Sequence, residues 1–594
     1  MRSSQLSGLS VEPQADAPPR RGFGLRDSAP FVITFLAGLI CYGLFFKRSA
    51  WLSVIGYSVS PAERVMQGEI PYRDFLYNYT PGMLWLNAGL MKAFGVSLSA
   101  INSGLFAFKM LTLVALFVVA RRLTSGRAAL IPVGLTLAWL GHKYIFGVVP
   151  TQYSLLFVLV GMLFMLNYDR SDKGVWLFLS GLAVGVVFLF KYNVGILLVG
   201  TGTAVVFIRE AILLTPAPVF KRMLAAVKQA SLYWAGFAAV TAALMIYMAS
   251  NNALGPMIDH FLHHAAEYSG ARAVPLPPVK WIGPAVAALL VAALGAVILL
   301  RFKPRLLESY LIAILIIGPL ALFLPGKLRI MKASGTALVA YLPVLLFVGA
   351  AALLVWRFKR EAKTSEDGRR WWSRSAAIII VGLFALGAFL EMYPRADYYH
   401  LVRVLPAIFL LLLLFIRRGA EVLGGLFKDR LQTPRRAALL CATIPLVLLA
   451  AVGIKDTWQP QFDSSFRLID REPLSIARAE GIKVSRRQKE FIEGMTHAIE
   501  ENSAPEDQIF SFSQRGTGFY FLAARRNPTR FVWWRSVGIK KDARSSVLEM
   551  IGERKPKLVL VQDSLTDPRV REAVNANYHK VAAVADIAVY DRNQ

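Results

Sequence analysis

The sequence predicts a mainly helical membrane protein with about 13 transmembrane helices and a small C-terminal α/β domain. Of the 594 residues, 55% are hydrophobic and only 18% are charged, and the mean hydropathy is +0.48. A soluble protein with a polar surface is less apolar than this. Apolar runs of about 17–25 residues recur along the chain, and each is long enough to cross a bilayer. The segment after residue 455 differs from the rest because its composition is ordinarily polar.

The apolar runs give the order of the expected spans. They cover residues 31–46, 105–120, 129–146, 153–166, 175–190, 194–207, 232–249, 282–300, 310–324, 338–356, 376–390, 401–416 and 438–454. With this count, the connections assigned to the cytoplasm are the most basic ones, and basic loops remain on the cytoplasmic side of a membrane. The sequence therefore predicts a cytoplasmic N-terminus and a periplasmic C-terminal segment. A helix at residues 83–94 is too short to cross and is expected on the outer surface.

Three regions are predicted from this topology. Residues 1–28 form a cytoplasmic tail, and residues 29–455 form the transmembrane domain, with a first outer loop at 48–101. Residues 456–594 form a periplasmic domain in which β-rich runs alternate with helical stretches, a pattern typical of an α/β domain with a partly parallel sheet. The expected strands are 508–513, 530–534, 557–562 and 587–590, and the expected helices are 485–501, 546–553 and 568–577.

The net charge of +29 does not indicate a nucleic-acid partner. Most lysines and arginines lie in short connections between apolar runs, where their role is to orient the spans. The two cysteines, Cys41 and Cys441, lie within apolar runs. Neither a disulfide framework nor a cysteine metal site is therefore expected.

The first outer loop concentrates polar residues in an apolar chain. Residues 60–82 read S-P-A-E-R-V-M-Q-G-E-I-P-Y-R-D-F-L-Y-N-Y-T-P-G. They hold three carboxylates (Glu63, Glu69, Asp74), two arginines (Arg64, Arg73) and three tyrosines (Tyr72, Tyr77, Tyr79). A carboxylate here could act as a general base towards an acceptor, or help to hold a divalent cation against a phosphate. The alternative is that these charges form solvated ion pairs.

A second polar motif, Y-P-R-A-D-Y-Y-H at residues 393–400, separates two expected spans on the same outer side. Arg395 can bind a phosphate through two hydrogen bonds, and Asp397 can orient either Arg395 or His400. The alternative is an aromatic belt with one anchoring arginine.

Further cations lie in predicted outer connections. Lys191 is a lone cation at a membrane edge, and Lys327, Arg329 and Lys332 share another outer loop. Cations retained on the outer side indicate an anionic ligand, although a lysine at this depth can also extend its ammonium to the interface. Residues 259–264 (D-H-F-L-H-H) have a metal-ligand spacing if helical, but no further ligand is identified and no metal site is assigned.

The run G-E-I-P-Y-R-D-F-L-Y-N-Y-T-P-G, followed by an apolar segment ending in Ala93-Phe94-Gly95, resembles the first outer loop of bacterial GT-C glycosyltransferases. These are the polyprenyl-phosphate-sugar enzymes related to protein O-mannosyltransferases and lipid A aminoarabinose transferases. The resemblance implies a multi-span fold, a lipid-linked sugar donor and an acidic residue of this loop as the base. Similar sequences also carry an R-x-D-x-x-H pattern like that at residues 395–400. They often carry an Asp-Glu pair where this chain has Val54-Ile55.

The resemblance implies an inverting hexosyl- or pentosyltransferase of the bacterial inner membrane. Its partners would be a polyprenyl-phosphate-linked sugar, the bilayer and a glycan, lipid or protein acceptor. The base is assigned to Asp74 or otherwise to Glu63 or Glu69, with Arg73, Tyr72, Asp397 and His400 in support. The donor phosphate is assigned to Arg395, Lys191, Lys327, Arg329 and Lys332. No cofactor is assigned beyond a possible divalent cation. The alternative function is a non-catalytic lipid-linked-glycan binding protein or a transporter.

Overall fold

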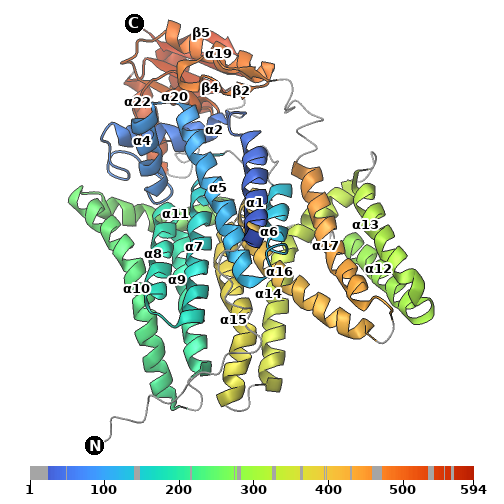
Figure 1. Cartoon of the computed structure of the whole chain (residues 1–594). Helices are drawn as coiled ribbons and strands as arrows, with labels where there is room; N and C mark the ends of the chain where they lie inside the picture. The colour runs from blue at the N-terminus through green and yellow to red at the C-terminus, as the bar shows by residue number, and fades with distance from the viewer. Residues whose placement is uncertain are drawn as a thin grey trace, which may run out of the picture.

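The computed structural model shows a bundle of long helices with a small sheet region at one end (Figure 1). It describes residues 25–48, 50–139, 147–213, 217–272, 274–276, 278, 283–323, 329–361, 365–393, 395–396, 398–428, 431–457, 471–532, 541–553, 555–562 and 567–593.

Each of the thirteen predicted spans contains a helix. These helices are α1 (Leu25–Gly43), α5 (Leu98–Leu123), α6 (Leu130–Ala138), α7 (Pro150–Ser171), α8 (Val175–Phe190), α9 (Tyr192–Leu213), α10 (Val219–Ser250), α12 (Gly283–Phe302), α13 (Leu307–Phe323), α14 (Arg329–Glu361), α15 (Ser365–Phe389), α16 (Tyr398–Phe427) and α17 (Pro434–Thr457). Eight of the described helices, namely α5, α7, α9, α10 and α14–α17, are long and apolar enough to cross a membrane. The chain is therefore a multi-pass membrane protein, while the full count of thirteen stays a prediction.

Local sequence signals explain where the helices begin and end. At the start of α5, the Ser97 side chain accepts a hydrogen bond from the backbone N–H of Ala100, which satisfies one of the free donors of the first turn. The helix α7 begins with Pro150, whose missing N–H costs nothing at that position. The helices α8 and α10 approach closely at Gly181, where a Cβ atom would overlap the carbonyl oxygen of Tyr233.

The basic helix ends meet at one end of the bundle. Arg170 of α7 donates to the carbonyl of Arg122, and Arg417 of α16 donates to the carbonyl of Leu123 at 3.1 Å. Nearby, Arg209 of α9 is buried and pairs with Glu210 at 2.6 Å. The gathering of these ends agrees with the prediction that these basic connections share one side of the membrane. Which side of the membrane that is stays a prediction.

The C-terminal region contains a four-stranded sheet in the order β3-β4-β6-β5. The strands are β3 (Ile509–Ser511), β4 (Leu558–Gln562), β5 (Tyr578–Val584) and β6 (Ile587–Arg592), and the short pair β1 (Glu472–Pro473) and β2 (Lys483–Val484) lies apart from this sheet. The strands β3 and β4 are parallel and the other two pairings are antiparallel, so the predicted partly parallel sheet is present. The helices of this region are α19 (Arg486–Glu501), α20 (Phe519–Leu522), α22 (Lys541–Gly552) and α23 (Pro568–Asn577).

In this region, one predicted strand does not join the sheet in its described part, and one observed strand was not predicted. The run predicted as a strand at residues 530–534 does not join the sheet in its described part, residues 530–532. Phe531 instead forms an isolated bridge with Leu76 of the opening segment, which comprises residues 52–82. The strand β5 was not predicted, although its second half, residues 581–584, is apolar in sequence.

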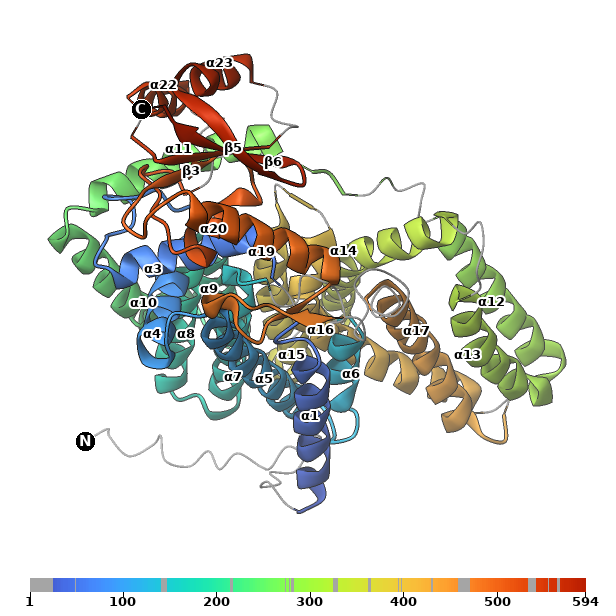
Figure 2. The ribbon, with the colours of Figure 1, turned by 90° about the horizontal axis from the view of Figure 1, so that it is seen from above.

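The sheet region covers the end of the bundle that carries the opening segment (Figures 1 and 2). The helices α3 (Ser60–Met66), α4 (Gly82–Phe94) and α11 (Leu254–Arg272) lie between the sheet and the long helices. The pair α12 and α13 projects to one side, next to α17. The helix α4 confirms the predicted short helix at residues 83–94.

Candidate functional site

The opening segment begins as a helix, for which no conformation was predicted. It consists of α2 (Leu52–Val54), the π-helix η1 (Ile55–Val59) and α3, so that Glu63 and Arg64 lie on α3. The chain turns at Gly68, whose φ of +95° is readily adopted by glycine. Val54 and Ile55 are buried, and their helical turn packs against the 3₁₀ helix η6 (Gly516–Gly518) of the C-terminal region.

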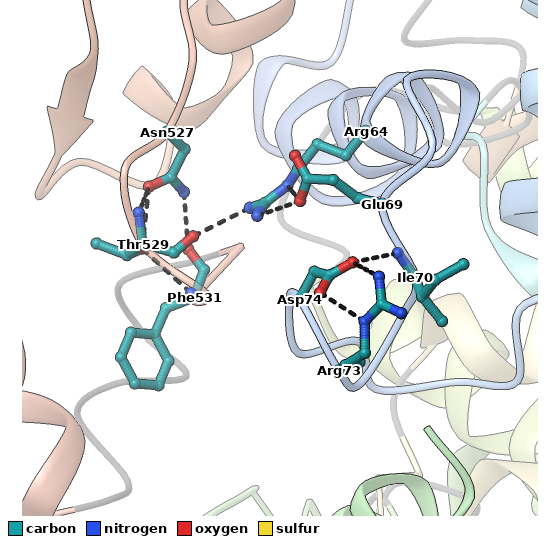
Figure 3. A network of polar contacts seen from close by, with 8 residues as sticks. All are labelled: Arg64, Glu69, Ile70, Arg73, Asp74, Asn527, Thr529 and Phe531. Carbon is teal, nitrogen blue, oxygen red and sulfur yellow. Dashed lines mark hydrogen bonds and ion pairs between the residues drawn. The ribbon is translucent and has the colours of Figure 1, made fainter. Parts of the chain in front are cut away.

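All three predicted carboxylate bases are paired with arginines. Glu63 contacts Arg478 of the C-terminal region at 2.8 Å. Figure 3 shows the other two: Glu69 contacts Arg64 at 2.6 Å, and Asp74 contacts the neighbouring Arg73 at 2.8 Å.

These surroundings shift the carboxyl pKa values in opposite directions. Burial raises the pKa of Glu63, against the opposing effect of Arg478. The hydrogen bond from Arg73 lowers the pKa of Asp74, and the backbone N–H of Ile70 contributes in the same direction. At neutral pH Asp74 is therefore a weaker base than an ordinary aspartate.

Further contacts join the C-terminal region to the opening segment (Figure 3). Arg64 donates to the carbonyl of Thr529 at 3.0 Å, and Asn527 holds that turn by accepting from the backbone N–H of Thr529 at 2.9 Å. Close by, the backbone N–H of Leu76 donates to the carbonyl of Arg530 at 2.7 Å. Several of the polar residues at 60–82 thus form an interface with the C-terminal region.

The end of the opening segment is seated on α8. The hydroxyl of Thr80 donates to the carbonyl of Phe188 at 2.6 Å. Gly82 lies so close to the end of α8 that a Cβ atom would be 2.6 Å from the carbonyl oxygen of Leu189. Tyr79 directly precedes the anchored Thr80. Its ring therefore lies beside Lys191, at the junction of α8 and α9.

A buried polar cluster lies at this junction. The ammonium of Lys191 contacts the carboxylate of Glu391 at 2.5 Å, and the side chains are 6% and 2% exposed. The hydroxyl of Thr151 at the start of α7 donates to the same carboxylate at 2.5 Å. On α5, the ammonium of Lys109 donates to Gln152 at 2.5 Å. Four separate parts of the chain thus contribute polar groups to this point.

The cluster has more cations than anions. The ring of half-buried Tyr79 lies 5.6 Å from the ammonium of Lys191. Burial raises the pKa of Tyr79, while hydrogen bonding to Tyr57 and the positive charges of Arg403 and Arg395 oppose that effect. Among the described residues, the four basic side chains of Lys191, Lys109, Arg395 and Arg403 outnumber the single carboxylate of Glu391. A site of this composition favours an anionic ligand such as a phosphate group.

Of the other predicted site residues, the structure describes the side chains of Arg395 and His400. Arg395 is half-buried and forms a bridge with Val274, and His400 lies in the first turn of α16. Arg329 and Lys332 were predicted in a loop, but they lie in the first turns of α14, and their side chains are outside the described residues. Lys327 and Asp397 also lie outside the described residues.

The segment 259–264 is helical, as its metal-ligand spacing requires, because it lies within α11. His263 pairs with Asp259 at 2.9 Å, and His260 is buried next to Tyr72. Among the described residues there is no group of three or more His, Cys, Asp or Glu side chains that could hold a metal ion.

Sequence reasoning missed Glu391, Thr151, Lys109 and Gln152. Two of them gave a signal. Glu391 directly follows the apolar run at residues 376–390, and Lys109 is a charged residue inside the run at 105–120. An ionisable residue within or at the end of a span usually faces the protein interior and has a function. Thr151 and Gln152 gave no comparable signal.

Residues 78–234 match the family model described as dolichyl-phosphate-mannose-protein mannosyltransferase. No curated protein matches the chain. Crystal structures of ArnT from Cupriavidus metallidurans are similar to this chain. For the form bound to undecaprenyl phosphate, the TM-score is 0.43 and the identity 13%, with 95% of this chain and 97% of that chain covered. For the apo state the TM-score is 0.42 and the identity 15%, with 95% of this chain and 98% of that chain covered.

The Archaeoglobus fulgidus oligosaccharyltransferase, solved in complex with Zn and sulfate, has a TM-score of 0.46 and 12% identity over 95% of this chain and 73% of its own. These TM-scores are too low for structural inferences. The family match begins inside the opening segment and includes Tyr79, Lys109, Thr151 and Lys191. The match supports the resemblance to GT-C glycosyltransferases found in the sequence, over about a quarter of the chain.

Proposed function

We propose that this protein transfers a sugar from a polyprenyl-phosphate donor to an acceptor on the periplasmic side of a bacterial inner membrane. The observation that supports the donor class is the buried cluster of cations around Lys191 and Glu391. The matched family is named after dolichyl-phosphate-mannose, which is itself a polyprenyl-phosphate sugar. The type of sugar, hexose or pentose, and the acceptor (glycan, lipid or protein) are left open.

The cluster suits the leaving group of this reaction. When the bond between the anomeric carbon and the phosphate oxygen breaks, negative charge builds up on the polyprenyl phosphate. Preorganised cations in a site shielded from water stabilise such charge more strongly than water does. We assign the phosphate to Lys191 and Lys109, with Arg395 and Arg403 at the rim. Lys327, Arg329 and Lys332 stay further candidates, and the isoprenoid chain would lie between apolar helices.

Glu391 has a defined role in this proposal. It pairs with Lys191 and accepts from Thr151, so it holds the ammonium in place within an apolar bundle. An incoming phosphate would compete with this carboxylate for the same ammonium. Glu391 thus prevents an uncompensated buried charge and lowers the affinity for phosphate at the same time.

For the acceptor side we propose Asp74 as the base that removes the proton during in-line, inverting attack. Glu63 and Glu69 are the weaker candidates because Arg478 and Arg64 hold them at the interface with the C-terminal region. Asp74 forms its ion pair with its exposed neighbour Arg73, and an exposed ion pair breaks easily.

The remaining assignments belong to the same proposal. Asp397 and His400 would support Arg395, and a divalent cation would need ligands beyond those identified. The division into a cytoplasmic tail at 1–28, a transmembrane domain at 29–455 and a periplasmic domain at 456–594 also stays a proposal. The apolar helices and the separate sheet region support it.

The test is transfer from radiolabelled polyprenyl-phosphate sugars to candidate acceptors by the purified protein in lipid nanodiscs. Lys191→Met is expected to lose donor binding and transfer together, and Asp74→Asn to lose transfer while donor binding persists. Lys92→Met, at the end of α4, is the lysine control. Full transfer by both Lys191→Met and Asp74→Asn would refute the assigned site.

A second function, binding of a lipid-linked glycan without transfer, is favoured by one observation. Val54 and Ile55 stand where related sequences often carry an Asp-Glu pair, and both side chains are buried against the C-terminal region. This alternative predicts tight donor binding without transfer to any acceptor. Hydrolysis or transfer of the labelled sugar would exclude it.

A further inference from the structure

Tyr72 has an unusual backbone conformation for a large side chain. Its φ is +71°, and the residue is fully buried. Bulky residues with positive φ are rare because Cβ clashes with the backbone. Such strain persists only where the surroundings enforce it, and it concentrates at functional sites.

Three contacts enforce this conformation. The backbone N–H of Tyr72 donates to the carbonyl of Phe75 at 2.6 Å. The guanidinium of Arg530, from the C-terminal region, donates to the carbonyl of Tyr72 at 3.3 Å. The ring packs edge-on against Phe261 of α11, with 5.5 Å between centroids. Tyr72 is therefore the point where the opening segment, α11 and the C-terminal region meet.

The hydroxyl of Tyr72 extends this junction to the buried cluster. It donates a short hydrogen bond to the carbonyl of Tyr79. The Tyr79 ring lies beside the Lys191 ammonium, and the next residue, Thr80, is anchored to the carbonyl of Phe188. A continuous series of contacts thus runs from Arg530 through Tyr72 and Tyr79 to Lys191.

We infer that Tyr72 is a positioning residue that makes the phosphate site depend on docking of the C-terminal region. When Arg530 is docked, the Tyr72 hydroxyl fixes the backbone of Tyr79 and keeps its ring against Lys191. Without this hydrogen bond the segment around Tyr79 has more conformational freedom. Phosphate binding must then pay the entropic cost of ordering that segment, which weakens the affinity. The inference rests on the proposed phosphate site.

The experiment measures binding of undecaprenyl phosphate to the full-length protein in nanodiscs, together with its thermal unfolding. Tyr72→Phe keeps the ring and removes the hydroxyl, and we expect about fivefold weaker binding, the effect of losing one ordinary hydrogen bond. The matched control is Tyr233→Phe, since Tyr233 is equally buried and its hydroxyl also donates to a backbone carbonyl, that of Leu198 at 2.9 Å. It is expected to bind like the wild type.

Arg530 provides a second test that does not alter a buried side chain. Arg530→Ala is expected to weaken binding as Tyr72→Phe does, and Arg530→Lys to restore most of it, because lysine can also donate to the Tyr72 carbonyl. A purely structural role would change thermal stability without this rescue of binding.

The outcomes separate the two proposals. If Lys191→Met loses binding but Tyr72→Phe and Arg530→Ala bind like the wild type, the role of Tyr72 is overturned and the phosphate site stands. If Lys191→Met binds like the wild type, the phosphate site itself is overturned, and the role of Tyr72 fails with it.

Discussion

Replacing Glu391 with glutamine is expected to have opposite effects on stability and on phosphate binding. Glutamine keeps an acceptor for the Thr151 hydroxyl but removes the charge that balances Lys191 at 2.5 Å. Removing one partner of a buried pair costs about 3–5 kcal/mol, because the other charge stays buried. We expect a loss of about 3 kcal/mol in the free energy of unfolding, since the glutamine retains one hydrogen bond.

The effect on phosphate binding follows from the geometry of the pair. Two anions that share one ammonium lie about 4–5 Å apart, and at an effective dielectric constant of about 20 they repel by roughly 3–4 kcal/mol. Removing the charge of Glu391 removes this repulsion. Relaxation of the site reduces the benefit, so we expect the affinity for undecaprenyl phosphate to rise by at least about tenfold, or about 1.4 kcal/mol.

The assay compares thermal unfolding with and without undecaprenyl phosphate, and measures its dissociation constant at fixed salt concentration. The matched control is Glu210→Gln, since Glu210 is also buried and pairs with Arg209 at 2.6 Å among the basic helix ends. Its destabilisation should be smaller, because Arg209 keeps a contact with Asp172 at 2.8 Å, and its phosphate affinity should be unchanged. Unchanged or weaker phosphate binding by Glu391→Gln would refute competition for Lys191.

Three further predictions concern the opening segment and the C-terminal region. The pKa of Asp74 is lowered in the folded protein, so its ionised form stabilises the fold at pH values above its ordinary pKa of 3.8. The stability difference between the wild type and Asp74→Asn should therefore disappear as the pH falls through and below that value. Thermal unfolding measured over a range of pH tests this. Arg478→Met leaves Glu63 buried without its cation, and should destabilise docking of the C-terminal region by about 3 kcal/mol. The weaker docking should be detected as faster proteolysis of that region. Equal cleavage rates for the variant and the wild type would contradict this prediction. Ser485→Ala removes the capping box at the start of α19 and should lower stability by about 1 kcal/mol in chemical denaturation, whereas the control Arg487→Ala, at an exposed position in the first turn of the same helix, should leave stability nearly unchanged.

Much of the architecture follows from patterns that are local in the sequence. Apolar runs of membrane length predicted the helices, because every backbone polar group in a bilayer must be bonded within its own segment. The alternation after residue 455 predicted α19, α23 and a partly parallel sheet, whose parallel pair is β3 and β4. The edge strand β5 was missed, although its residues Ala582 and Val584 pack against the core.

The candidate site was only partly predictable. The sequence indicated Lys191 as a cation in an outer connection, and Arg395 through the motif at residues 393–400. It did not identify Glu391 as the partner of Lys191, since Glu391 lies 200 residues further along the chain. The carboxylates of the opening segment were assigned to catalysis, but the structure pairs Glu63 with Arg478, which is 415 residues away.

By itself, then, the sequence determined that this is a multi-span membrane protein, where most of its helices lie, and that its opening segment resembles that of GT-C glycosyltransferases. Each of these depends on residues that are close together in the chain. Only the tertiary structure decided which charges meet: Lys191 with Glu391, and the acidic opening segment with arginines of the C-terminal region. The physical reason is that an ion pair forms over a few ångströms of space, and sequence patterns carry no information about which distant residues the packing of helices will bring together.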